Sequence, residues 1–195
     1  MQAGVLALQG DFEAHVRACA RAGLGVAREV RLPAHLEGLD ALVLPGGEST
    51  TISKGLARTG LDRALRERIA AGLPVLGTCA GAILLARRVQ NHPVPTLGVL
   101  DVTAVRNAYG TQVDSFTAGV DAGAAAGLEG LKAVFIRAPR LEALGPGVEV
   151  LARVDGAPVL VRQGHVLAAT FHPELTDDPR VHGLLAAAVG QRARA

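Results

Sequence analysis

Residues 74–86 constrain the fold of this chain more than any other segment, and they read Pro-Val-Leu-Gly-Thr-Cys-Ala-Gly-Ala-Ile-Leu-Leu-Ala. A short apolar run typical of a buried strand leads into Gly-x-Cys-x-Gly, and an apolar helical run follows at once. The pattern predicts that Cys79 lies on a sharp strand-to-helix turn, at the N-terminus of the helix. Glycines on both sides of Cys79 remove side chains that would clash there, and the helix dipole favours a thiolate. We therefore interpret Cys79 as a nucleophile.

A base for this nucleophile occurs near the end of the chain, in Thr170-Phe171-His172-Pro173-Glu174. The apolar run before it predicts a strand, and residues i and i+2 of a strand project to the same side. Pro173 fixes its own φ and restricts the residue before it. We expect the Glu174 carboxylate to bond one imidazole nitrogen of His172 while the other faces the thiol. Cys79, His172 and Glu174 would then be nucleophile, base and orienting group in an acyl transfer.

The other histidines lack this context, and we expect them at the surface: His15, His35, His92, His165 and His182. Cys19 falls in a helical pattern and is interpreted as a small buried residue. Two cysteines are too few for a disulfide framework and do not have the spacing of a metal site. We expect neither a metal ion nor a cofactor.

Pro45-Gly46-Gly47-Glu48-Ser49 follows the apolar run Asp40–Leu44. Backbone N–H groups without neighbouring side chains can approach a developing oxyanion, so the N–H groups of Gly47 and Ala80 are expected to form an oxyanion hole. Ser49 or Thr50 is expected to cap the next helix. The chain contains neither Gly-x-x-x-x-Gly-Lys-Ser/Thr nor Gly-x-Gly-x-x-Gly, so the sequence does not support a nucleotide site.

Strands and helices are expected to alternate in the first half of the chain. A strand Ala3–Leu8 precedes a helix from Phe12 to about Ala22 capped by Asp11, and further elements are strands Gly25–Val30 and Asp40–Leu44, a helix Asp62–Ala71, the strand Pro74–Leu76 and a cysteine helix ending near Asn91-His92-Pro93. Such alternation predicts a parallel sheet with helices on both faces.

The second half is expected to add antiparallel strands. They are Leu100–Val105, Phe116–Val120, Ala133–Ile136, Val148–Val154, Pro158–Arg162 and Val166–Phe171, with hairpin turns at Asp155-Gly156 and Gln163-Gly164, a surface loop over Ala118–Gly127 and a last helix Arg180–Arg194. We therefore expect an α/β fold, a flavodoxin-like three-layer sandwich, in one domain over residues 1–195. Ligands of such sheets bind at the carboxyl ends of the strands, where Gln9-Gly10, Gly46-Gly47, Cys79 and His172 are expected.

Composition excludes several classes of function. The net charge is +2 with charges of both signs interspersed, which gives no basic patch for nucleic acid. No apolar run approaches the roughly 20 residues of a membrane-spanning helix. The N-terminus lacks the positive segment of a secretory signal, so we expect a cytoplasmic protein.

The motifs taken together resemble the triad-type glutamine amidotransferases, and more narrowly the glutaminase subunits of pyridoxal 5′-phosphate synthase. The segments that carry the resemblance span nearly the whole chain: Leu8-Gln9-Gly10 with Glu13 and His15, Leu44-Pro45-Gly46-Gly47-Glu48-Ser49-Thr50, Gly77-Thr78-Cys79-Ala80-Gly81, Arg106-Asn107-Ala108-Tyr109-Gly110, Ile136-Arg137-Ala138-Pro139 and Phe171-His172-Pro173-Glu174. His-Pro-Glu or Pro-Gly-Gly alone would not separate this family from other glutaminases.

The resemblance implies that the chain hydrolyses glutamine through a glutamyl thioester on Cys79. It implies glutamine-binding roles for Gly46, Gly47, Glu48, Arg106, Ile136 and Arg137, with Arg137 as our choice for the α-carboxylate. It also implies a hetero-oligomer with a pyridoxal 5′-phosphate synthase subunit that accepts the ammonia and activates the glutaminase. The chain after Glu174 has room only for the last helix, so no ammonia-using domain is expected, and the Gln9-Gly10 turn and the helix after Asp11 are the expected docking elements.

Three alternatives stay open at this point. The chain could be a glutaminase that serves another synthase, for example in histidine or purine synthesis. It could be a cysteine hydrolase or peptidase of similar α/β architecture. It could also be an interaction subunit without catalysis, although such a protein would be expected to lose the nucleophile or the base.

Overall fold

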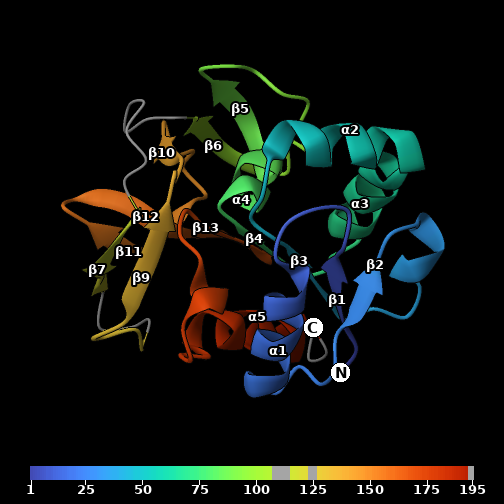
Figure 1. Ribbon diagram of the computed structural model, residues 1–195, viewed down its shortest axis with the longest axis horizontal. Helices are drawn as coiled ribbons and strands as arrows, with labels where there is room; N and C mark the ends of the chain where they lie inside the picture. Colours follow the sequence, from blue (N-terminus) through green and yellow to red (C-terminus); the bar gives the residue numbers. More distant parts are fainter. Residues whose placement is uncertain (107–114, 123–126, 193–195) are drawn as a thin grey trace.

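A central sheet of eight strands organises the computed structural model, which describes residues 1–106, 115–122 and 127–192 (Figure 1). Its strands, in spatial order, are β2 (Arg28–Val30), β1 (Ala3–Leu6), β3 (Ala41–Leu44), β4 (Val75–Thr78), β13 (Val166–Ala169), β12 (Ala157–Gln163), β11 (Glu149–Val154) and β8 (Asp121–Ala122). The first five strands are parallel, and β12, β11 and β8 extend the sheet in antiparallel fashion. The expected combination of parallel and added antiparallel strands is confirmed.

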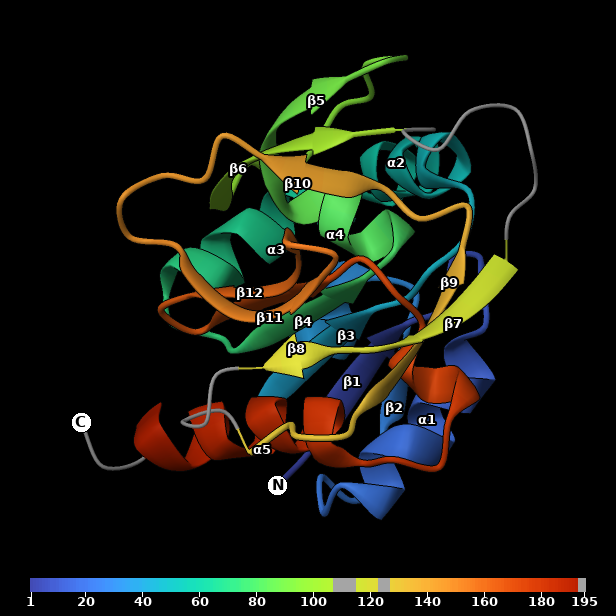
Figure 2. The same ribbon diagram turned by 90° about the vertical axis from the view of Figure 1, so that its left-hand side faces the viewer.

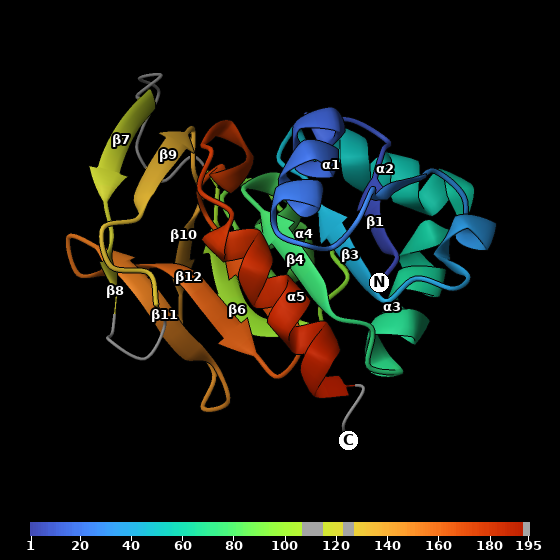
Figure 3. The same cartoon turned by 90° about the horizontal axis from the view of Figure 1, so that it is seen from below.

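Helices cover both faces of this sheet, as Figure 2 shows edge-on. The α-helices are α1 (Phe12–Arg21), α2 (Ser49–Thr59), α3 (Leu61–Ala70), α4 (Ala80–Leu85) and α5 (Arg180–Arg192), and the 3₁₀ helices are η1 (Pro33–Leu36) and η3 (Pro173–Leu175). α1 and α5 lie together on one face (Figure 3), and α2, α3 and α4 lie on the other. The three-layer α/β sandwich predicted from the sequence is confirmed. No helix in the described ranges is long and apolar enough to cross a membrane.

Strand β3 shows how the sequence builds these layers. Leu42 and Leu44 pack in the hydrophobic cluster under α2, α3 and α4, whereas Ala41 and Val43 pack in the cluster under α1 and α5. The alternation follows from the two-residue period of a strand, and burial of each large aliphatic side chain contributes about 1.5–3 kcal/mol. Cys19 of α1 is fully buried in the second cluster, as expected.

Two smaller sheets complete the structure. One contains β10 (Arg140–Glu142), β6 (Leu100–Val105) and β5 (Ala86–Gln90), and the other pairs β7 (Ser115–Gly119) with β9 (Lys132–Ile136). The expectation that the cysteine helix ends near residues 91–93 is wrong, because α4 ends at Leu85. The backbone is extended from Ala86, and β5 pairs in parallel with β6. Pairing with the next strand along the chain overrides local helical preference there.

Several local predictions can also be compared with the structure. Asp11 caps α1 by accepting a hydrogen bond from Ala14 N, as expected. Asp155 and Gly156 both have positive φ and join β11 to β12, which confirms that hairpin. Within the expected loop at 118–127, residues 118 and 119 belong to β7 and residues 121 and 122 to β8, while 123–126 lie outside the described residues. The last helix is confirmed to Arg192, and residues 193–195 also lie outside.

Candidate active site

Cys79 occupies a single-residue turn between β4 and α4, which confirms the predicted strand–turn–helix. Its backbone has φ 48° and ψ −105°, a combination that few non-glycine residues adopt. The backbone N–H of Cys79 donates to the carbonyl of Ala169 on β13, at 2.8 Å. Strain of this kind costs on the order of 1–3 kcal/mol and persists only where the surroundings fix it, which is typical of functional positions.

The glycines beside Cys79 are required by the close approach of backbone segments. A Cβ at Gly81 would overlap the carbonyl oxygen of Leu44 on β3, and a Cβ at Gly77 would lie 2.6 Å from the Gly81 backbone. Because both obstacles are backbone atoms, they cannot move aside as a flexible side chain could. The two glycines therefore let α4 start against the ends of β3 and β4.

His172 and Glu174 are in contact, but not by the route expected from the sequence. Strand β13 ends at Ala169, and His172 caps the 3₁₀ helix η3, which begins at Pro173. The expected strand geometry is therefore wrong, because Pro173 starts a helical turn in place of the next strand residue. The expected bond is nevertheless present, with 2.7 Å between His172 Nδ1 and Glu174 Oε1. The Glu174 side chain is only 1% exposed, so this carboxylate lies behind the imidazole and out of solvent.

The charges of this pair stabilise each other. Burial alone would raise the pKa of Glu174, but its interactions with His15 and His172 outweigh burial and lower that pKa well below its usual range. Burial alone would lower the pKa of His172, but its interactions with Cys79 and Glu174 raise it from 6.5 to about 10. The arrangement therefore favours an imidazolium next to a carboxylate, and an imidazolium can stabilise a thiolate.

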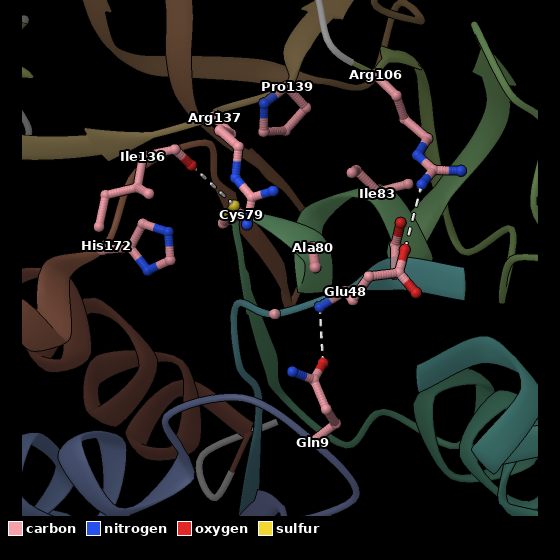
Figure 4. Close-up of a pocket in the computed structure, with 12 residues that line it drawn as sticks. Gln9, Glu48, Cys79, Ala80, Ile83, Arg106, Ile136, Arg137, Pro139 and His172 are labelled. Atoms are coloured by element: carbon pink, nitrogen blue, oxygen red, sulfur yellow. Dashed lines mark hydrogen bonds and ion pairs between the residues drawn. The ribbon is translucent and has the colours of Figure 1, made fainter. Parts of the chain in front are cut away.

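A pocket of about 250 Å³ opens above Cys79 (Figure 4), and most of the predicted site residues line it: Gly47, Glu48, Cys79, Ala80, Arg106, Ile136, Arg137 and His172. Gln9, Ser49, Ile83 and Pro139 complete the lining. Gly46 lies beside the wall, since a Cβ there would be 2.5 Å from His172 Cε1 and 3.3 Å from Cys79 Cβ. The volume is below the roughly 300–1,000 Å³ of pockets for drug-sized ligands, which suits a ligand of amino-acid size.

Glu48 and Arg106 face each other at this pocket, with 3.4 Å between Glu48 Oε1 and Arg106 Nη2. Glu48 is also the N-cap of α2, so the expected cap at Ser49 or Thr50 is wrong by one or two residues. Burial acts to raise the pKa of Glu48, but hydrogen bonds from the backbone and hydroxyl groups of Thr50 and Thr51 lower it to about 2. Residues 107–110 of the Arg106 motif lie outside the described residues.

Arg137 is the second cation at the pocket, and its side chain points toward Cys79 (Figure 4). Its φ is 46°, and it follows directly after β9. In the described part of the chain no carboxylate lies within ion-pair distance of Arg137, whereas Arg106 contacts Glu48 and also donates to the carbonyl of His92, at 2.7 Å. Arg137 is therefore the cation better placed to accept a ligand carboxylate.

The expectation that His15 and His182 are surface residues is wrong, because both are fully buried. His15 Nε2 lies 3.3 Å from Glu174 Oε2, directly behind the His172–Glu174 pair. The sequence does carry a signal for their burial. His15 shares a helical stripe with Ala18 and Cys19, and His182 shares one with Leu185 and Val189, at the i+3, i+4 and i+7 spacing of a buried face.

Comparison with solved structures defines the class of protein. The chain matches a crystal structure described as a glutamine amidotransferase with a TM-score of 0.90 and 52% sequence identity, over 96% of this chain and 98% of that chain. At this similarity, the chain has the fold of a glutamine amidotransferase.

Within that class, the model of the SNO glutamine amidotransferase family matches residues 5–190, and the chain belongs to this family. Two curated relatives are named pyridoxal 5′-phosphate synthase subunit PdxT. One, from a strain of Thermus thermophilus, is 56% identical over 181 residues, 92% of this chain and 93% of the relative. The other, from Thermotoga neapolitana, is 52% identical over 182 residues, 93% of this chain and 96% of the relative. The resemblance found in the sequence motifs is thereby confirmed.

Proposed function

We propose that this chain hydrolyses L-glutamine to L-glutamate and ammonia, with Cys79, His172 and Glu174 as its catalytic triad. The observation that carries the proposal is the 2.7 Å contact between His172 and Glu174 beside a strained cysteine, in a pocket of amino-acid size. Membership of the glutamine amidotransferase family supports glutamine as the substrate.

The reaction follows from which imidazole nitrogen is free. Glu174 engages Nδ1 of His172, which leaves Nε2 to take the proton from the Cys79 thiol. The thiolate sulfur attacks the side-chain amide carbon of glutamine, and His172 passes the proton to the departing nitrogen as ammonia leaves. A glutamyl thioester remains on Cys79. His172 then deprotonates a water molecule that attacks this thioester, and the reaction ends with glutamate and the restored thiol.

Two backbone N–H groups are proposed to stabilise the oxyanion of both tetrahedral intermediates. Ala80 follows the nucleophile, Gly47 lies in the loop after β3, and both residues line the pocket. A side chain at Gly47 would be strained by its φ of 153° and would approach the Gln9 amide oxygen to 2.5 Å. One donor of this kind typically contributes about 10²–10³-fold to kcat.

The remaining pocket residues are proposed to hold the amino-acid end of glutamine. Arg137 would bind the α-carboxylate, because in the described ranges no protein carboxylate neutralises it. Glu48, which stays ionised well below neutral pH, and Arg106 would hold the polar groups around the α-carbon. Gly46 and Ile136 would complete the contact surface along the substrate chain.

We further propose that the ammonia passes to a pyridoxal 5′-phosphate synthase subunit in a hetero-oligomer, as the name of the relatives suggests. Gln9 lines the pocket, and the turn Gln9-Gly10 leads directly into α1. A partner that binds α1 could therefore act on the loop after β3 that contains Gly47. Gln9 Oε1 already accepts a hydrogen bond from Glu48 N, at 2.7 Å. A reduced Cys79 is required throughout, which fits a reducing cytoplasm.

Ammonia release from glutamine, measured with and without the synthase subunit, tests this proposal. We expect Cys79→Ala to abolish release, and the matched Cys19→Ala to keep it, because Cys19 is buried in the apolar cluster outside the pocket and burial raises its pKa to about 12. Release by the Cys79 variant at the wild-type rate would overturn the glutaminase proposal. Full release without the synthase would overturn only the proposed activation by the partner.

A further inference from the structure

Two buried histidines extend the hydrogen-bonded site beyond Glu174. His15 on α1 and His182 on α5 come from the two helices on the same face of the sheet (Figure 3), and both are 0% exposed. His15 Nδ1 and His182 Nε2 are 2.9 Å apart, although the residues are 167 positions apart in the sequence. His15 Nε2 lies 3.1 Å from Thr78 Oγ1 and 3.3 Å from Glu174 Oε2. The chain of polar atoms thus runs from His172 through Glu174 and His15 to His182.

One arrangement of protons on the two histidines satisfies the hydrogen-bonding groups of this row of polar atoms better than the other. If His15 carries its proton on Nε2, it can donate toward Thr78 and Glu174, and His182 donates from Nε2 to His15 Nδ1. The atom left without a partner is then the lone pair on His182 Nδ1, which is buried and unbonded among the described residues. In the opposite arrangement a lone pair of His15 would face the carboxylate and His182 would bury an unbonded N–H, which costs more.

The second carboxylate oxygen of Glu174 depends on His15 for a hydrogen-bond donor. Oε1 is bonded to His172, but Oε2 is buried and has no hydrogen bond of good geometry in the described part of the chain. His15 Nε2, at 3.3 Å, is the donor that faces it. Without that donor, a buried carboxylate oxygen would be left without compensation, and Glu174 would rotate or take up a proton.

We propose that His15 is a positioning residue that holds the second carboxylate oxygen of Glu174, and that His182 fixes the tautomer in which His15 can do so. The inference rests on the proposed role of Glu174 in orienting His172. His182 suits its part because burial lowers its pKa to about 3 and keeps its ring neutral. The site would therefore be tied to both α1 and α5.

A matched pair of variants separates this role from packing. His15→Gln keeps an N–H donor and an acceptor at nearly the same reach, whereas His15→Met has similar size but no donor. With saturating synthase subunit, we expect His15→Met to lower kcat about 10-fold or more with KM within about twofold of wild type, and His15→Gln to stay within about threefold. A kcat of His15→Met within twofold of wild type would overturn the inference, as would an equal loss in both folded variants.

His182 provides a second, independent test. His182→Gln and His182→Met form the same pair one step farther away, and we expect a loss of about 2- to 10-fold in kcat for the methionine variant only. Because His182 acts through His15, the double variant H15M/H182M should be no slower than H15M. A further loss of kcat in the double variant would overturn the proposal that His182 acts through His15. If H15M does not fold, the comparison of H182M with H182Q tests the inference instead. Absence of Cys79-dependent hydrolysis in the wild type would instead refute the proposed function itself.

Discussion

The Nδ1 atom of His172 lies 2.7 Å from Oε1 of Glu174, and the glutamate side chain is almost completely removed from solvent. The contact fixes which nitrogen of the imidazole remains free to face Cys79. It also places a carboxylate where positive charge develops when His172 takes the thiol proton. The two residues are thus related as base and orienting group.

Replacement of the carboxylate by an amide tests this relationship. Glu174→Gln keeps the side-chain size but removes the charge and allows the wrong imidazole tautomer, so we expect kcat to fall by about 10²–10⁴-fold. Steady-state ammonia release with saturating synthase subunit measures the change. Glu142→Gln, at an exposed position of β10, is the matched control and should stay within twofold of wild type. A loss of less than tenfold in Glu174→Gln would mean that the charge of this residue is not used.

The lowered pKa of Glu174 predicts a specific dependence of stability on pH. Between pH 5 and 3 the unfolded chain takes up a proton on this residue, near its ordinary pKa of about 4.3, while the folded protein does not. The stability contributed by Glu174 is therefore present above that range and lost as the pH falls, by at most about 1.4 kcal/mol per pH unit. His172 adds no slope there, because it is protonated in both states. Urea denaturation should show a smaller loss between pH 5 and 3 for Glu174→Gln; equal slopes would contradict the assignment.

The close packing of Gly81 against β3 predicts that a side chain at this position lowers stability. Gly81→Ala would drive a methyl group into the carbonyl of Leu44, so we expect a loss of about 1–3 kcal/mol in the free energy of unfolding. Gly183 in α5 is the matched control, since a Cβ there meets nothing within 4 Å. Gly183→Ala should raise stability by about 0.5–1 kcal/mol, because alanine favours a helix. Urea denaturation of both variants measures the difference, and equal effects would refute the proposed close packing at Gly81.

The proposed role of Arg137 predicts that its replacement weakens the affinity for glutamine. If its guanidinium binds the α-carboxylate, Arg137→Met should raise KM for glutamine by about 10–100-fold, the value of a charge-assisted hydrogen bond. Arg153→Met, on β11 and outside the pocket, serves as control and should leave KM unchanged. An unchanged KM in Arg137→Met would assign the carboxylate to another residue, with Arg106 as the next to test.

Much of this site could be predicted from the sequence because its residues follow strands. Cys79, Gly46 and Gly47 each come directly after or close behind a strand of the parallel sheet, which gathers such ends at one edge. Arg137 also follows a strand, but β9 belongs to the separate two-stranded sheet with β7. The sequence predicts the contact between His172 and Glu174 from strand geometry, whereas in the structure a turn of 3₁₀ helix makes the bond.

What could not be predicted depends on tertiary packing. The helical spacing indicates that His15 and His182 are each buried, but only the packing of α1 and α5 on the same sheet face brings the two side chains into contact. The sequence does not predict strand β5, because Ala86–Gln90 directly follows an apolar helical run, and only its pairing with β6 makes it extended. Tertiary contacts of this kind leave weak local signals.

The proposed glutamyl thioester on Cys79 is the central claim, and its direct detection is the most decisive measurement. The enzyme would be mixed with glutamine in the presence of the synthase subunit, quenched in acid, digested and analysed by mass spectrometry. We predict a glutamyl adduct on the peptide that contains Cys79, formed together with ammonia, and neither adduct nor ammonia with Cys79→Ala. Ammonia release that persists in Cys79→Ala, with no adduct on the wild-type peptide, would contradict the account.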